Sequence, residues 1–157
     1  MVRPTVGCRS YLTRVVYKLL PALENDMSDW LVETRVKASA LLHVLMTHME
    51  ETPVAAQHAD KVLNLMLSGA RDDEVRVVKN VCRVAEAYGA FVPPKTWLSL
   101  ACPKVLAADP RASATDLMVV SLVVQASDKE LFAHVAEDLV LTLQDDTVCL
   151  RIDVSRI

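Results

Sequence analysis

Apolar side chains recur along this chain at intervals of three and four residues, the spacing that places them on one face of an α-helix. Between residues 7 and 27 these positions are Leu12, Val15, Val16, Leu19, Leu20 and Leu23. The same pattern, interrupted by short polar links, predicts helices at about 7–27, 30–49, 53–69, 73–88, 93–109, 113–126 and 128–143. Because no stretch alternates as a half-buried strand would, the sequence predicts an all-α fold.

Residue types at the boundaries support these helices. Thr52 and Pro53 are typical of a cap followed by a first helical position. Gly69 and Gly89 are expected to end the third and fourth helices in the left-handed conformation. Two pairs resemble capping boxes of the last two helices: Ser113 with Asp116, and Ser127 with Glu130.

The paired helices repeat along the chain. Pro21 and Pro103 are 82 residues apart, two units of 41, and the tripeptide KVL at 61–63 returns at 104–106, a spacing of 43. This period matches the ~40–47 residues of HEAT and armadillo units and excludes the 33–34 of ankyrin and tetratricopeptide units. We expect a HEAT-repeat α-solenoid, a right-handed superhelix of antiparallel helix pairs, with repeats at about 7–49, 53–89 and 93–126 and an incomplete one at 127–157.

The first repeat carries the clearest signature. Asp29 follows Pro21 by eight residues, and Arg35 follows Asp29 by six. Pro21 is expected to bend the first helix, Asp29 to accept hydrogen bonds from the N–H groups that open the second, and Arg35 to pair with such an aspartate. The same six-residue spacing returns at Asp145 and Arg151.

Composition narrows the class of protein. The chain is 52% hydrophobic and 24% charged, and its longest uncharged apolar run is the eleven residues 117–127, against the ~20 that span a bilayer. The net charge of −3 argues against broad nucleic-acid binding, and no secretory signal is visible. These features predict a soluble, intracellular protein that binds neither membrane nor nucleic acid. The pattern is lost at 152–157, which suggests a fragment of a longer solenoid.

Chemistry-bearing residues do not form recognisable motifs. The cysteines at 8, 82, 102 and 149 lack zinc-site spacing and are expected to be reduced, small core residues. His43 and His48 are five apart, so they do not share a helix face as metal ligands would. Glycine occurs only at positions 7, 69 and 89, which excludes a glycine-rich phosphate loop. We therefore expect no catalytic residues, metal or cofactor.

Two groups of residues are candidates for partner binding. Trp30 and Trp97 could anchor an interface, although packing of the repeat joints is the favoured interpretation. Arg76, Lys79 and Arg83 fall within about 60° on one face of the fourth helix, where they could receive an acidic segment of a client. Pairing with carboxylates of the same chain is the favoured alternative for this basic stripe.

The amino-acid sequences of individual repeat segments are also informative. The segments SDWLVETRVKA (28–38), DKVLNLMLSGARDDE (60–74), AEAYGAFVPPKTWLSL (85–100) and ATDLMVVSLVVQAS (114–127) resemble the dynein axonemal assembly factor 5 family, and the resemblance covers about 3–143. It implies a non-enzymatic cytoplasmic HEAT scaffold for axonemal dynein preassembly. The partners it implies are dynein heavy and intermediate chains, chaperones and other dynein assembly factors.

Two other classes share this architecture. A nuclear transport receptor would bind GTP-loaded Ran, and it is the main alternative. A HEAT-like DNA glycosylase would need a basic groove and a catalytic acid beside an aromatic residue, and the net negative charge argues against it.

Overall fold

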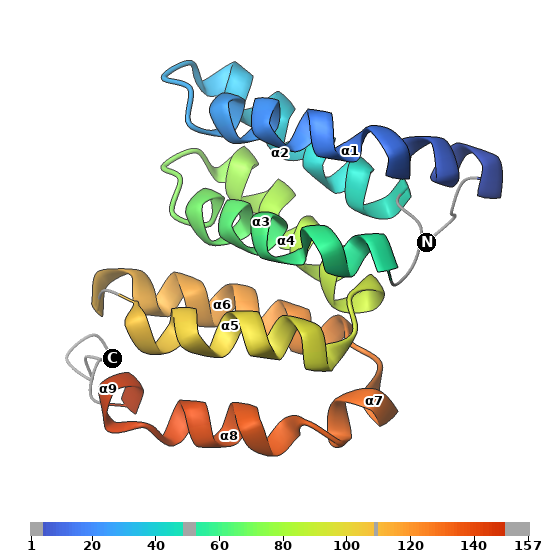
Figure 1. Ribbon diagram of the computed structural model, residues 1–157. Coiled ribbons are helices and arrows are strands. Elements are labelled where there is room, and N and C mark those ends of the chain that lie inside the picture. Colours follow the sequence, from blue (N-terminus) through green and yellow to red (C-terminus); the bar gives the residue numbers. More distant parts are fainter. Residues whose placement is uncertain (1–4, 49–52, 109, 150–157) are drawn as a thin grey trace.

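The computed structural model describes residues 5–48, 53–108 and 110–149, which contain nine α-helices and no strand (Figure 1). The helices are α1 Val6–Met27, α2 Val32–His48, α3 Pro53–Gly69, α4 Val75–Phe91, α5 Pro94–Ala107, α6 Pro110–Ala126, α7 Lys129–Ala133, α8 Ala136–Gln144 and α9 Asp146–Cys149. None of the described helices combines the length and apolar content that crossing a membrane requires. The prediction of an all-α fold is confirmed.

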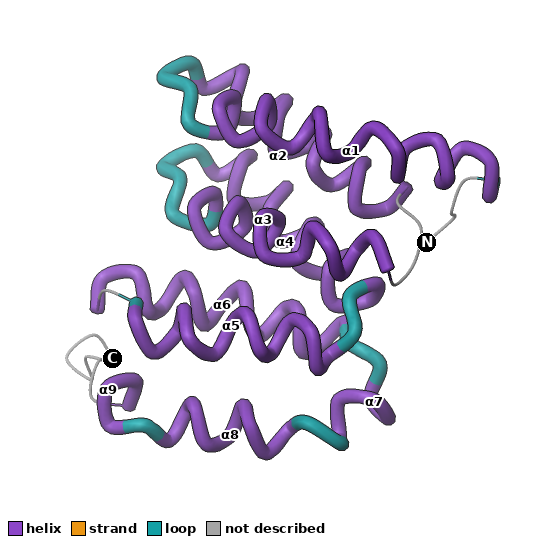
Figure 2. Tube along the Cα trace, viewed as in Figure 1, coloured by secondary structure: helices purple, strands orange, loops and turns teal. Residues whose placement is uncertain are grey.

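The helices are stacked in two layers. Helices α1, α3, α5 and α8 lie side by side in one layer, and α2, α4 and α6 form the other (Figure 1). The turns between α1 and α2 and between α3 and α4 lie along one edge of the stack, and the link from α4 to α5 lies at the opposite edge (Figure 2). Successive antiparallel pairs therefore form a solenoid, as the repeat spacing predicts.

The repeated sequence positions fall in one layer. Pro21 lies inside α1 and Pro103 inside α5, both exposed. The KVL segments at 61–63 and 104–106 lie in α3 and α5. In both copies the valine, Val62 or Val105, is buried in the core between the layers. The predicted bend at Pro21 stays a prediction.

Gly89 does not end a helix, contrary to the expectation from sequence. Helix α4 continues through it to Phe91, and a Cβ atom on Gly89 would collide with the carbonyl oxygen of Val123 in α6. Glycine is therefore needed for the close approach of two helices rather than for a left-handed backbone. Gly69 does end α3, but a Cβ there would come within 2.8 Å of side-chain atoms of Met27 and Val81, so it too serves packing.

The predicted helix at 128–143 is broken into α7 and α8. Ser127 is not its cap, because Asp128 accepts hydrogen bonds from the N–H groups of Glu130 and Leu131, both at 2.9 Å. The break at 134–135 contains neither glycine nor proline, so local propensity does not cause it. Instead, Phe132 of α7 stacks on Trp97 of α5, which ties this short helix to the preceding pair.

The other predicted capping box is also wrong, because α6 begins at Pro110 and contains Ser113 within its length. Thr52, Arg151 and the tail 152–157 lie outside the described residues.

A continuous core joins the helix pairs. Tyr88 of α4 is fully buried and donates a hydrogen bond of 3.1 Å from its hydroxyl to the carbonyl oxygen of Ala59 in α3. Burial raises the pKa of the Tyr88 phenol well above its ordinary value, so this group stays neutral and keeps its proton for the bond. The expectation of core cysteines is wrong for Cys8, which is an exposed free thiol, while Cys82 and Cys102 are half-buried.

Candidate functional site

An ion-pair network joins the first two helix pairs at their turns. Asp29 accepts a 2.7 Å hydrogen bond from the N–H of Leu31, the residue just before α2. The Arg35 guanidinium makes a forked contact with the carboxylate of Asp72, at 2.7 and 3.0 Å, and reaches Asp73 at 2.8 Å. It also donates to the backbone carbonyl of Asp29 at 3.1 Å. Arg35 therefore fastens the turn of its own pair to the turn of the next.

The electrostatics of Asp72 follow from this contact. Its side chain is 8% exposed, and burial alone raises the pKa of its carboxyl group. Hydrogen bonds from Arg35 and from the N–H of Glu74 act against burial, and the pKa lies below its ordinary value as a result. Asp72 is therefore a charged carboxylate at neutral pH.

A second ion pair joins the next two helix pairs. Arg71, in the turn before α4, places one guanidinium nitrogen 2.7 Å from both carboxylate oxygens of Asp116 in α6. The Asp116 side chain is 2% exposed, whereas that of Arg71 is 44% exposed. The negative charge of this buried carboxylate is thus balanced by a guanidinium group that contacts it from the surface.

The residues of the basic stripe differ in their surroundings. Arg76 lies 2.8 Å from Glu33 of α2 and 3.1 Å from Glu74, and these carboxylates raise its pKa. Lys79 and Arg83 are exposed and form no ion pair with any residue that the structure describes. The stripe therefore presents, on the middle helix of its layer, two cations that are unpaired among the described residues.

The two tryptophans have opposite environments. Trp97 is 1% exposed, stacks on Phe132 with ring centroids 6.0 Å apart, and donates a 3.2 Å hydrogen bond from Nε1 to Ser127. Trp30 is 84% exposed, so the expectation that it packs the joint between helices is wrong. Arg35 holds the turn through main-chain carbonyls, including that of Trp30, and the indole itself lies in solvent.

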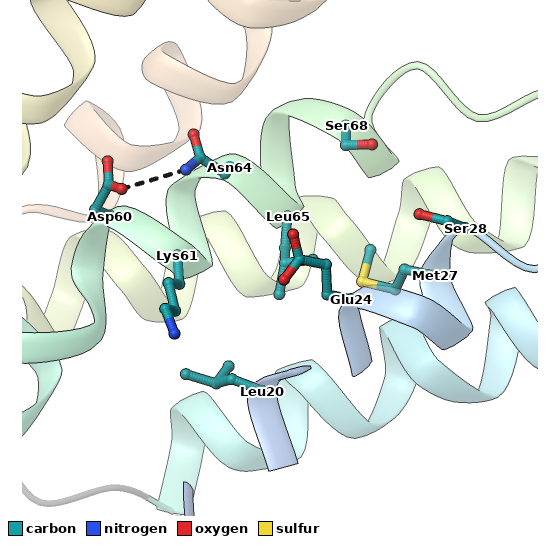
Figure 3. A pocket seen from close by; sticks show the side chains of 9 residues that line it. All are labelled: Leu20, Glu24, Met27, Ser28, Asp60, Lys61, Asn64, Leu65 and Ser68. Carbon is teal, nitrogen blue, oxygen red and sulfur yellow. Dashed lines mark hydrogen bonds between the residues drawn. The ribbon is translucent and has the colours of Figure 1, made fainter. Parts of the chain in front are cut away.

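The layer of α1, α3 and α5 carries two grooves. One, of about 430 Å³, lies between α1 and α3, where Leu20, Glu24 and Met27 of α1 face Lys61 and Leu65 of α3 (Figure 3). The other, of about 400 Å³, lies among α3, α5 and α6 beside Asp116 and Lys104. Within the described ranges no three His, Cys, Asp or Glu side chains gather as a metal site would require. Both grooves are lined by a mixture of polar and aliphatic side chains.

Comparison with known proteins shows to which family the chain belongs. The model of the HEAT-repeat domain of dynein axonemal assembly factor 5 matches residues 1–156. The chain belongs to this family.

Individual members of the family are similar over most of the chain. Dynein axonemal assembly factor 5 of Homo sapiens is 44% identical over 98 residues, which are 62% of this chain and 11% of that protein. The mouse protein is 34% identical over 148 residues, and the Xenopus laevis protein 32% over 147; each alignment covers 94% of this chain and 17% of the relative. The chain thus spans 11–17% of the length of these relatives. No solved structure matches it.

Several residues that matter in this member of the dynein axonemal assembly factor 5 family could not be selected from the sequence. Arg71 and Asp116 are 45 positions apart, and Arg35 and Asp72 are 37 apart, so only the stacking of repeats brings them together. One signal was available, because Asp116 is the single charged residue between positions 112 and 127. A charge inside such an apolar run needs a partner, and that partner proved to lie in the preceding repeat.

Proposed function

We propose that this chain is a section of a non-enzymatic HEAT scaffold that acts in the cytoplasmic preassembly of axonemal dynein arms. In this proposal the scaffold binds dynein heavy and intermediate chains together with chaperones and other assembly factors. The observation that carries the proposal is the match of residues 1–156 to the HEAT-repeat domain of dynein axonemal assembly factor 5. We further propose that the array divides into units at 7–49, 53–89, 93–126 and an incomplete 127–157.

The architecture supports a scaffolding role. Stacked helix pairs display a long surface whose shape depends on the joints between pairs, which suits binding of extended partners. The joints are held by the Arg35 and Arg71 ion pairs, so the surface is built on fixed elements. The grooves lack the convergent nucleophile, base and oxyanion donors that catalysis needs.

We assign client contact to the basic stripe of Arg76, Lys79 and Arg83. Arg76 lies 2.8 Å from Glu33 of α2, and the charge of Arg83 adds to the burial that lowers the pKa of His43 on α2, so two of the three stripe residues lie near α2. Lys79 and Arg83 have no partner within the described chain, so an acidic segment of a client can pair with both without displacing an existing contact. Arg76 is already paired with Glu33 and would contribute less.

The test is affinity purification of the chain from cells that are building motile cilia, scored for axonemal dynein heavy and intermediate chains. We expect recovery of both by the wild-type chain, and loss of recovery by the double variant Lys79→Glu, Arg83→Glu. The matched control reverses two exposed charges of the other layer, Arg14→Glu and Lys95→Glu, and should recover dynein as the wild type does. Absence of dynein chains from the wild-type sample would contradict the function, whereas equal recovery by all three would contradict only the stripe.

A further inference from the structure

The edge of the solenoid that holds the first two turns exposes apolar side chains. Trp30 is 84% exposed at the turn between α1 and α2, and Leu31 beside it is 46% exposed. Val75, at the start of α4, is 62% exposed. Both turns lie along the same edge (Figure 2). Tryptophan is among the residues most enriched at interface hot spots, and here it stands beside two other exposed apolar side chains.

The main chain that carries the indole is fixed. Arg35 donates a 3.3 Å hydrogen bond to the carbonyl oxygen of Trp30 and a 2.8 Å bond to the carboxylate of Asp73. One guanidinium therefore holds the Trp30 backbone beside the second turn. A rigid turn with a free aromatic side chain lowers the entropy that binding costs, because only the side chain remains to be ordered.

The charge around the indole is negative. Residues 24–33 and 72–74 contain seven carboxylates, and the arginines close to them are Arg35, Arg71 and Arg76. Arg71 is matched by Asp116, which lies outside both segments. The two segments therefore hold more carboxylates than there are arginines beside them; Asp73 pairs with Arg35 at 2.8 Å, yet its side chain is 90% exposed and open to a second cation.

Two of these carboxylates oppose the stability of the helix that carries them. Glu24 and Asp26 are exposed in the last turn of α1, which contains no basic residue. Negative charge is unfavourable at a helix C-terminus, where the carbonyl groups already point outward. Neither side chain has an ion-pair partner among the described residues, although Glu24 lines the groove between α1 and α3 together with Lys61. Charges that reduce stability without a contact inside the chain are free to be compensated by a bound partner.

We propose that this edge is a docking surface for a basic protein segment, in which the indole of Trp30 enters an apolar pocket flanked by lysine or arginine side chains. Glu24, Asp26 and Asp73 supply the complementary charge, and a cation beside the indole face adds a cation–π contact. The surface lies on the turns of the helix pairs; it meets the basic stripe at Arg76, which pairs with Glu33 and Glu74, and does not include Lys79 and Arg83. The inference does not depend on the proposed dynein function, because it specifies the chemistry of the segment and not its source.

The test uses the whole chain and a random-peptide phage library as the probe. Panning on the immobilised wild-type chain should enrich peptides that combine two or more Lys or Arg with an apolar cluster. A synthetic peptide of the enriched sequence should protect Trp30 from acrylamide quenching and bind more weakly as salt is raised. Trp97 is buried, so quenching of the free chain reports mainly on Trp30.

Three variants make the assignment specific. Trp30→Ser should weaken peptide binding at least about tenfold, and Glu24→Gln with Asp26→Asn should weaken it several-fold and reduce its salt dependence. Tyr11→Ser is the matched control, since Tyr11 is 69% exposed at the far end of α1 and should not affect binding. Circular dichroism checks that each variant is folded. Enrichment of acidic or uncharged peptides, no enrichment at all, or binding that survives Trp30→Ser would overturn the proposal.

Discussion

The ion pair between Arg71 and Asp116 predicts a loss of unfolding free energy whose size depends on which partner is removed. The Asp116 side chain is 2% exposed and that of Arg71 is 44% exposed, with both carboxylate oxygens 2.7 Å from one guanidinium nitrogen. Arg71→Ala leaves a buried carboxylate without a counter-charge, which costs about 3 kcal/mol of unfolding free energy. Asp116→Ala leaves a guanidinium that water already reaches, so its cost is about 1 kcal/mol.

The measurement is urea and thermal unfolding of the 157-residue chain at neutral pH, followed by far-ultraviolet circular dichroism. For a chain of this length each kcal/mol lowers the Tm by about 2–4 °C, so Arg71→Ala should lower it by about 6–12 °C. The double variant should unfold close to Asp116→Ala alone, because the buried charge is gone once Asp116 is removed. Arg14→Ala, at an exposed position of α1, is the control and should stay within about 0.5 kcal/mol of the wild type.

Equal losses for Arg71→Ala and Asp116→Ala would refute this reasoning. So would a double variant whose loss is the sum of the two single losses. Either result would mean that Asp116 is hydrated without Arg71 and that the contact behaves as a surface ion pair.

Three further predictions concern the packing and charge of the repeats. Gly89→Ala should destabilise the chain by about 2–3 kcal/mol, because the new methyl group collides with α6. Gly7→Ala, whose new methyl group meets no atom within 4 Å, should stabilise the chain by about 0.5–1 kcal/mol. Thermal unfolding that ranks the two variants in another order would contradict this. Trp97→Ala should cost about 3–5 kcal/mol and remove most of the near-ultraviolet dichroism, and Trp30→Ala should change stability by under about 0.5 kcal/mol. Because the pKa of Asp72 is lowered in the fold, its charge stabilises the folded chain at any pH above the ordinary carboxyl pKa, and this contribution is lost as the pH falls through the lowered value. The difference in unfolding free energy between the wild type and Asp72→Asn should therefore become smaller on acidification. A difference that does not depend on pH would count against this prediction.

Local features of the sequence determined most of the helices. The first six predicted helices are present with ends within a few residues of the predicted ones, since apolar spacing and prolines act within one or two turns. Pro53 and Pro94 stand at the first positions of α3 and α5 because proline has no N–H that a helix would leave unsatisfied there. The two-layer solenoid followed from the repeat period, because helices of equal length joined by short turns stack in register.

Tertiary structure decided which residues lie in contacts between helices and which are exposed to solvent. From its local sequence Gly89 is expected to end a helix. In the structure it lies within α4, at a close contact with α6. The break after α7 has no local cause and arises beside the stacking of Phe132 on Trp97. From its local sequence Trp30 is expected to pack the joint between helices, yet its side chain is exposed and only its backbone carbonyl is bound, by an arginine five positions later.

The sequence by itself thus determined the helices, their pairing and the class of fold, since these depend on interactions between residues that are close along the chain. Only the tertiary structure decided that Asp72 pairs with Arg35 and Asp116 with Arg71, at separations of 37 and 45 residues. The physical reason is that each charged group has many candidate partners in the sequence. Its desolvation by the neighbouring repeat selects one of them, and that repeat is in place only after the helices have stacked.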